Sequence, residues 1–106
     1  MSKLIVVTWR DIPAQVIVKR GRETARAPLS DRFQIAIDRA AMRAGKGSSD
    51  AYLADWKRSE PRACGDDILE EARAEAERLE TRYSDEDLER LIRSRGLDGP
   101  AQPGEE

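Results

Sequence analysis

The sequence predicts an α+β domain in which a small antiparallel sheet of about three strands packs against two main helices. Two β-branched runs near the N-terminus predict a hairpin, and two later stretches have the apolar period of amphipathic helices. A short apolar stretch between them supplies the third strand, so the expected order is β-β-α-β-α-α, ending in a short helix. The 106 residues fit one domain, expected over residues 1–96, with 97–106 as a disordered tail.

The N-terminal hairpin is the strongest structural signal. Leu4–Trp9 and Ala14–Lys19 are rich in Val and Ile, and the residues from Arg10 to Pro13 form the expected connection, since proline cannot donate to a strand ladder. Both faces of the first strand are apolar, so we expect helices on both faces of the sheet, or a second copy on one. Glu23–Ala27 either continues the second strand or forms a short strand of its own.

The first helix is expected over Ser30–Ala44, with Ser30 as its N-cap and Gly45 as its stop. One stripe of Phe, Ile and Ala faces the core, whereas Ile35 and Met42 fall on nearly the opposite side. Two interpretations of this second apolar line remain open: burial under the C-terminal helices, or a docking stripe for a partner. A short edge strand is expected around Ala54–Arg58.

A long helix is expected over Asp67–Tyr83, with its apolar side chains on one face and its charged ones on the other. Ser84 and Asp87 have the spacing of a capping box, which predicts a short last helix. Gly96 is its expected stop.

Charge narrows the classes of function. The net charge of −2 and the pI of about 5.3 argue against non-specific binding to nucleic acid or anionic membranes. The charge is uneven, however: through Arg62 the chain has 13 Lys and Arg against 7 Asp and Glu, and from Ala63 onward 6 against 14. Such a molecule could pair its own halves, dimerise, or present two different patches to partners.

The cellular location follows from exclusions. The single cysteine, Cys64, rules out an internal disulfide and favours a reducing compartment. The N-terminal apolar run is too short for a signal peptide, and no run approaches the ~20 apolar residues that span a bilayer. We therefore expect a cytoplasmic protein.

Side chains that commonly carry catalysis are scarce. There is no histidine, no glycine-rich phosphate loop and no nucleophile motif. Cys64 lies beside Arg62 and before an expected helix N-terminus, so it is either a functional thiol with a lowered pKa or a small structural residue. We expect no catalytic residue, no cofactor and no metal. An acidic cluster lies at the start of the expected long helix: Asp66, Asp67, Glu70 and Glu71. It is either a divalent-cation site or a set of carboxylates favoured there by the helix dipole.

A basic patch near the hairpin leaves nucleic-acid binding open as an alternative. Its residues are Lys19, Arg20, Arg22 and Arg26. Trp9 and Trp56 could stack on bases beside it, but Trp9 is equally suited to the core. The other interpretation is a solvated, partner-facing or self-paired patch.

The string from Trp9 to Gln15 is the most distinctive in the chain. As a structural element it is a rigid connection, in which Pro13 sets φ and Ile12 closes the end of the core. As a functional element it is a protein contact loop, because Trp and Arg often anchor interfaces. The expected contact residues are Trp9, Arg10, Ile12 and Gln15, with Arg20 and Arg22 for electrostatic steering and Ile35 and Met42 as the docking stripe.

Three strings resemble a small bacterial family labelled as a "virulence factor" domain: VVTWRDIPAQVIVKRGR, DRFQIAIDRAAMRAG and SDAYLADWKR. The resemblance covers about Lys3 to Arg95 and supplies no catalytic residue or cofactor. Related domains joined to an iron–sulfur scaffold-like domain and helical repeats imply an interaction module. Stand-alone members encoded beside folate- and corrinoid-dependent one-carbon enzymes in alphaproteobacteria imply an accessory subunit.

These observations together predict a non-enzymatic protein-interaction or accessory module. Its partner is expected to be another protein or a second copy of itself, and no membrane is involved. Two alternatives come from other classes: a basic-patch nucleic-acid-binding protein, and a small enzyme of unknown reaction. Binding that falls steeply with salt would indicate the first, and a well-formed pocket with a perturbed pKa the second.

Overall fold

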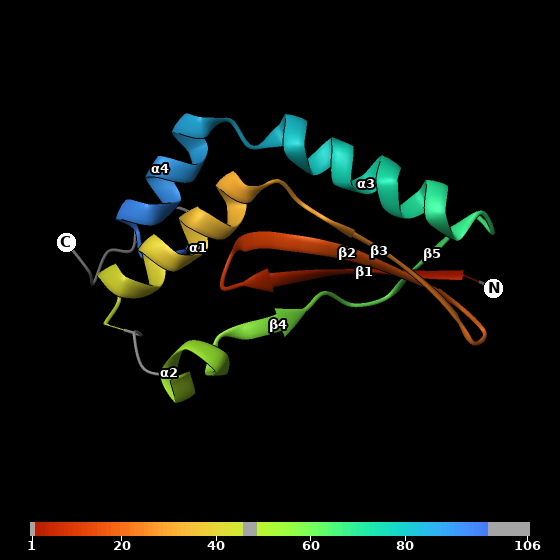
Figure 1. Cartoon of the computed structure of the whole chain (residues 1–106), viewed down its shortest axis with the longest axis horizontal. Helices are drawn as coiled ribbons and strands as arrows, with labels where there is room; N and C mark the ends of the chain where they lie inside the picture. The colour runs from red at the N-terminus through yellow and green to blue at the C-terminus, as the bar shows by residue number, and fades with distance from the viewer. Residues whose placement is uncertain (1, 46–48, 98–106) are drawn as a thin grey trace.

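A computed structural model describes residues 2–45 and 49–97. One mixed-length antiparallel sheet lies under three helices, which confirms the α+β class (Figure 1). The elements follow in this order: β1 Ser2–Trp9, β2 Ile12–Arg20, β3 Glu23–Pro28, α1 Asp31–Arg43, α2 Ser49–Ala54, β4 Trp56–Arg58, β5 Arg62–Cys64, α3 Ile68–Arg82 and α4 Asp85–Arg93.

The sheet has five strands rather than the three expected. Its order is β3-β2-β1-β4, with β5 also pairing β1 on the side of β4. A turn through Gly21, whose φ is +59°, makes β3 a separate strand. The chain that pairs with the outer side of β1 is divided into β4 and β5, because the pairing register with β1 changes by one residue between them. Val7 lies opposite Arg58, but Leu4 lies opposite Arg62.

The connection between β1 and β2 is shorter than predicted. Only Arg10 and Asp11 form the turn, because β2 already begins at Ile12. Pro13 lies inside the strand, opposite Thr8, where the β1–β2 ladder shifts register. An irregular ladder position tolerates a residue without an N–H, so proline fits the strand there.

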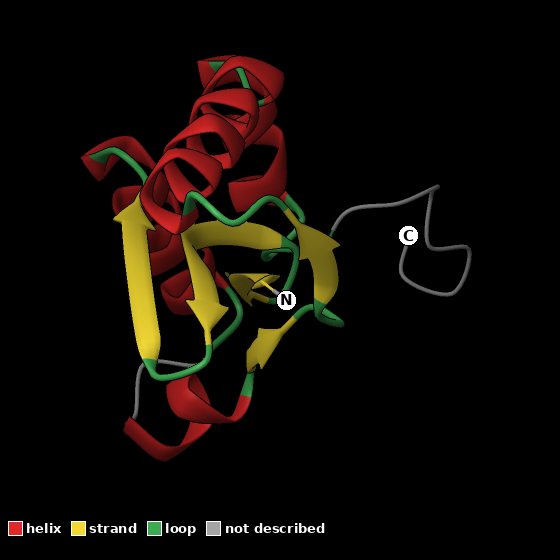
Figure 2. Cartoon of the chain, turned by 90° about the vertical axis from the view of Figure 1, so that its right-hand side faces the viewer, coloured by secondary structure: helices red, strands yellow, loops and turns green. Residues whose placement is uncertain are grey.

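The expected edge strand over Ala54–Arg58 is partly wrong, since helix α2 continues through Ala54 and β4 begins at Trp56. The Asp55 backbone N–H still bonds to the Tyr52 carbonyl, which extends the helical turn up to the strand. In both views α2 lies on the opposite side of the sheet from α1, α3 and α4 (Figures 1 and 2).

One aliphatic core fills the space between the sheet and the three helices. Leu4, Val16 and Val18 of the strands belong to one buried cluster with Phe33 of α1 and Leu91 of α4, and all five are almost fully buried. Of the two coverings expected from the sequence, the one with helices on both faces is therefore wrong, and a second copy on the other face stays a prediction. Apart from α2 at one end, the described helices cover a single face.

The predicted helix ends are confirmed, although the Ser30 side chain makes no capping bond to α1. α1 begins after Ser30 and is followed by Gly45 with a φ of +73°. Asp67 caps α3 by accepting from the Glu70 backbone N–H, and Ser84 forms the predicted capping box of α4.

The predicted tail lies outside the described residues apart from its first residue. Among the described residues, no helix is both long and apolar enough to cross a membrane.

A polar junction fixes the three helices relative to each other. Arg32 of α1 donates to the Glu80 carbonyl at 2.7 Å and pairs with the carboxylates of Glu80 and Asp85. Glu80 also accepts from the backbone N–H and hydroxyl of Ser30. The N-cap of α1 is thus satisfied by α3 rather than by its own side chain.

Candidate functional site

The turn after β1 is anchored to the rest of the protein by the side chains of Trp9 and Arg10. The Trp9 ring is fully buried, stacks on Tyr52 at a centroid distance of 6.0 Å, and donates from Nε1 to the Tyr52 carbonyl at 2.8 Å. Arg10 lies over the Trp9 ring, pairs with Asp55 at 3.3 Å and donates to the Arg95 carbonyl at 2.9 Å. These contacts tie the turn to α2 and to the end of α4.

This geometry fits the rigid-connection interpretation of the string. Trp9 and Ile12 are both 0% exposed, so neither side chain has a surface that a partner could bind. Their predicted contact role does not fit the structure. Arg10 is engaged on three sides but still lines a shallow cleft of about 330 Å³, and Gln15 lines another.

The remaining predicted residues lie apart. Arg20 is 4.0 Å from Asp66, and Arg22 lies exposed at the β2–β3 turn. Ile35 and Met42 project from α1 with 54% and 72% of their surface exposed. The interpretation in which the C-terminal helices bury this apolar line is therefore wrong. The contact residues do not form a single site.

A more coherent surface is the side of the sheet that α1, α3 and α4 leave uncovered and that carries only α2 at one end (Figures 1 and 2); we call it the open face. Because strand side chains alternate, its members follow from the register with β1. They are Lys3, Ile5 and Val7 of β1, Gln15, Ile17 and Lys19 of β2, Thr24, Arg26 and Pro28 of β3, Arg58 of β4 and Ala63 of β5.

The open face has an aliphatic centre and a basic surround. Ile5 and Ile17 lie opposite each other and are only 8% and 1% exposed, yet they lie outside the main core. Neighbouring side chains of the same face therefore cover them, as the aliphatic stems of long cationic residues commonly do. These two covered side chains form the floor of the open face, and the accessible surface above them comes from the neighbouring side chains.

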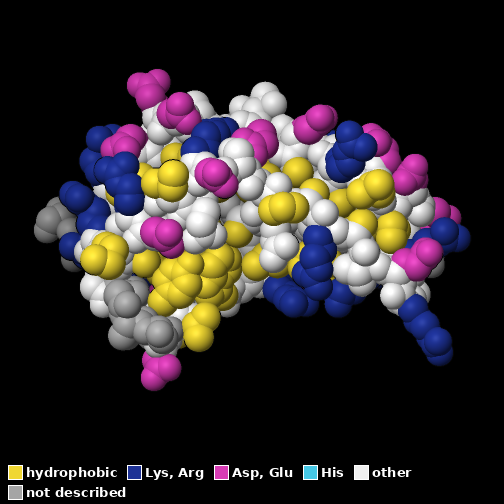
Figure 3. Space-filling model, in the orientation of Figure 1, with side chains coloured by type: hydrophobic (Ala, Val, Ile, Leu, Met, Phe, Trp, Pro, Cys, Tyr) yellow, Lys and Arg dark blue, Asp and Glu magenta, His cyan; other side chains and the backbone are white. Residues whose placement is uncertain are grey.

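Four cations surround this floor, and the strands add no carboxylate to it. They are Lys3, Lys19, Arg26 and Arg58. None of the four forms an ion pair within residues 2–45 and 49–97. In Figure 3, Lys and Arg side chains gather below the middle of the molecule, whereas Asp and Glu stand among Lys and Arg along its upper side, where Figure 1 places the helices. The open face is thus electropositive on a protein of net negative charge.

A shallow cleft of about 350 Å³ opens at the α2 end of this face. Val7 of β1 and Gln15 of β2 line it together with the three residues of β4, which are Trp56, Lys57 and Arg58. Trp56 is half-buried and meets Tyr52 edge to face at 5.8 Å. The alternation of side chains along β1 is enough to predict Val7 on this face. Arg58 and Trp56 come beside Val7 only through the pairing of β1 with β4.

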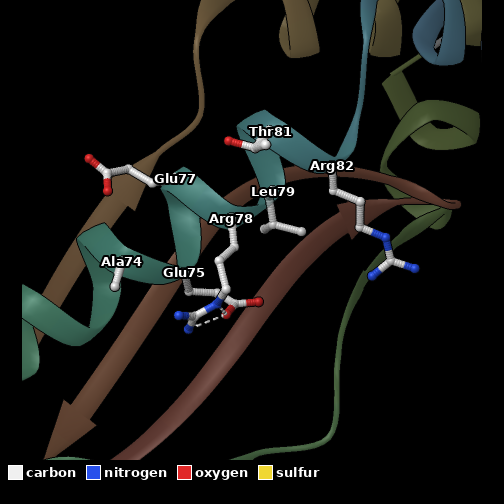
Figure 4. A pocket seen from close by; sticks show the side chains of 7 residues that line it. All are labelled: Ala74, Glu75, Glu77, Arg78, Leu79, Thr81 and Arg82. Carbon is white, nitrogen blue, oxygen red and sulfur yellow. Dashed lines mark hydrogen bonds and ion pairs between the residues drawn. The ribbon is translucent and has the colours of Figure 1, made fainter.

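A larger depression of about 640 Å³ lies along α3 (Figure 4). All of its lining residues come from that one helix, and Glu77 and Thr81 point away from the others in Figure 4. Its main carboxylate, Glu75, is already neutralised by Arg78 at 2.6 Å and Arg62 at 2.8 Å. We assign no binding role to this surface.

Of the two interpretations of Cys64, its electrostatics oppose the functional thiol with a lowered pKa. Burial and the nearby Glu71 carboxylate raise the pKa of Cys64, and Arg62 offsets them only in part. A raised pKa leaves less thiolate at neutral pH, which does not suit a nucleophile.

The acidic cluster before α3 is used structurally. Asp67 caps the helix, and Asp66 accepts from the Ser2 hydroxyl at 3.3 Å. Within the described part of the chain, no group of three or more Asp, Glu or Cys side chains is arranged to hold a metal ion.

Comparison with known proteins gives one match. A family model described as "Virulence factor" matches residues 7–92, which is most of the chain. No curated protein and no solved structure matches the chain. The matched range contains every element from β2 to α3 in full, together with Val7 of the cleft in β1.

Proposed function

This chain belongs to the Virulence factor family, and we propose that it is a non-enzymatic binding module whose open face receives an extended acidic segment of a partner protein. The observation that carries the proposal is the group of four cations without ion pairs around an aliphatic floor. Unpaired charges on a rigid face are available to a ligand without breaking any internal contact.

The side chains assigned to the open face favour a protein over nucleic acid, because none of them is aromatic. Sequence-tolerant binding of single strands relies on successive exposed aromatic side chains. Here the centre is aliphatic, and Trp56 is the half-exposed aromatic beside the cleft. An acidic segment would place carboxylates on the cations and one apolar side chain in the cleft.

Two further features support a role without catalysis. The chain has no histidine, and Cys64 has a raised pKa. The partner suggested by the family resemblance is a folate- or corrinoid-dependent one-carbon enzyme, and a cytoplasmic location belongs to that same proposal.

A fluorescence titration tests the proposal, because Trp56 borders the cleft. The probes are a short peptide of alternating Glu and Val and a single-stranded oligothymidylate of similar length. We expect the peptide to give a saturable change that weakens with salt. Reversing two cations, Lys19→Glu with Arg26→Glu, should weaken peptide binding at least about tenfold, equivalent to about 1.4 kcal/mol.

The matched control reverses two exposed arginines on the helices, Arg73→Glu with Arg93→Glu, and so makes the same change in net charge. This variant should bind the peptide like the wild type. Equal weakening in both double variants would show a net-charge effect and contradict a specific site. Saturation by oligothymidylate alone would replace the proposal with the nucleic-acid alternative.

A further inference from the structure

The surface of α1 that faces away from the core has an internal symmetry. Ile35, Asp38, Arg39 and Met42 follow the i, i+3, i+4, i+7 spacing that places side chains along one stripe of a helix. All four are exposed. In Figure 3, apolar side chains interrupt the charged surface over α1.

Read in either direction, the stripe has an apolar residue at each end and a charged pair at its centre. We propose that a second copy of this chain binds here, with the two α1 helices antiparallel about a two-fold axis between Asp38 and Arg39. Each Ile35 then lies opposite Met42 of the second copy. Each Asp38 lies opposite Arg39 of the second copy, so one stripe complements itself in apolar contact and in charge.

The internal contacts of the central pair leave room for this partner. Asp38 accepts one bond from the Gln34 amide at 2.9 Å, and a carboxylate has further lone pairs. Arg39 pairs with Glu89 at 3.0 Å, but both side chains are about half exposed and a guanidinium has five N–H donors. Neither residue has to give up a partner in order to bind across the axis.

The contact is small, so the dimer should be weak. Ile35 and Met42 are two helical turns apart, about 10 Å along the axis. A contact of this length buries less than the roughly 1,200 Å² typical of stable interfaces. The equilibrium should therefore depend on concentration within the range that sedimentation can measure. Because α1 lies on the opposite side of the sheet, the dimer leaves both open faces free.

Sedimentation velocity on the full chain at rising concentration tests the inference through charge exchange. Asp38→Arg gives a copy with two cations at the centre of the stripe, and Arg39→Asp gives a copy with two anions. Each single variant should weaken self-association at least about tenfold, because like charges then meet twice across the axis. An equimolar mixture of the two should associate again, as should the double variant Asp38→Arg with Arg39→Asp.

Glu77→Arg on the exposed side of α3 makes the same charge change as Asp38→Arg and should leave association unaltered. A wild-type chain that stays monomeric at the highest concentration would overturn the inference. So would a mixture of the single variants that associates no better than either alone. The peptide titration is carried out on dilute monomer and does not depend on the dimer. Failure of one proposal therefore does not contradict the other.

Discussion

Gly96 lies where the β1–β2 turn meets the end of α4. Its carbonyl accepts from the Asp11 backbone N–H at 2.8 Å, and its own N–H donates to the Leu91 carbonyl at 2.7 Å. Its φ of +86° favours glycine, and an added Cβ would lie 2.9 Å from Cζ3 of the Trp9 ring. The residue therefore combines a helix stop with close packing against the largest buried side chain.

Gly96→Ala should destabilise the protein by about 2–4 kcal/mol. The left-handed backbone accounts for about 1–2 kcal/mol, and the contact with Trp9 for the remainder, because that ring is fully buried and cannot move aside. Urea unfolding, monitored by circular dichroism, measures the loss.

Gly21→Ala is the matched control, since Gly21 has a φ of +59° but open space where its Cβ would lie. We expect it to cost about 1 kcal/mol. If the two substitutions cost the same, steric contact with Trp9 contributes nothing and the packing argument at Gly96 is wrong.

At the scale of elements, the capping box of α4 links stability to pH. The Asp87 carboxylate accepts from the Ser84 backbone N–H at 3.0 Å, and the Ser84 hydroxyl accepts from the Asp87 N–H at 3.1 Å. The bond from the Ser84 backbone lowers the pKa of Asp87 below its ordinary value of 3.8, with a further contribution from the Ser84 side chain. The folded state therefore stabilises the ionised form.

Asp87→Asn mimics the protonated acid and should lower the free energy of unfolding at neutral pH. A carboxyl with a lowered folded-state pKa contributes fully above its unfolded value and loses that contribution as pH falls through the folded value. The difference between wild type and variant should thus be constant above about pH 5 and shrink below about pH 4. Glu86→Gln, in the same helical turn, removes a charge without a capping bond and should have a smaller effect. A gap that persists at low pH would contradict the assignment.

The sequence predicts elements well where local chemistry decides them. The capping box of Ser84 and Asp87 marks the start of α4, and Gly45, which has no side chain, marks the end of α1. Both helices lie where these residues predict them. Pro13 misleads because its missing N–H could be accommodated at a ladder irregularity as well as in a turn. That choice depends on strand pairing, which is non-local.

The functional residues were harder to predict for the same reason. Apolar side chains such as Trp9 and Ile12 suit an interface as well as a core. Trp9 lies in the core because it packs against Tyr52 and Gly96, which are distant in the sequence. Arg58 reaches the open face through its pairing with Val7. No local pattern contains that pairing.

Across the whole molecule, the uneven charge is used in two ways. Ion pairs join the basic first part to the acidic second part on the helix-covered side: Arg32 with Glu80, Arg39 with Glu89, and Arg62 with Glu75. On the open face, the cations of the first part have no acidic counterpart from the strands. The fold thus pairs some of its charge internally and leaves the rest available.

The outer edge next to β1 is protected against pairing with other chains. β4 and β5 are three residues each, and the one-residue slip between them falls over Ser59, Glu60 and Pro61. Ser59 bonds Val6 through both its N–H and its hydroxyl there, which holds the break in place. Short strands, a charge and a proline are the usual means by which a sheet edge avoids growing.

Replacing this break by strand-forming residues should expose a continuous edge. Glu60→Val with Pro61→Val restores a backbone donor and removes the charge, so β4 and β5 can merge into one strand that pairs with other molecules. We expect faster growth of thioflavin T fluorescence under agitation than in the wild type. Glu77→Leu with Thr81→Leu adds comparable apolar surface to α3 and should not accelerate it. If the α3 variant aggregates as fast, added apolar surface is the cause and the edge has no special protective role.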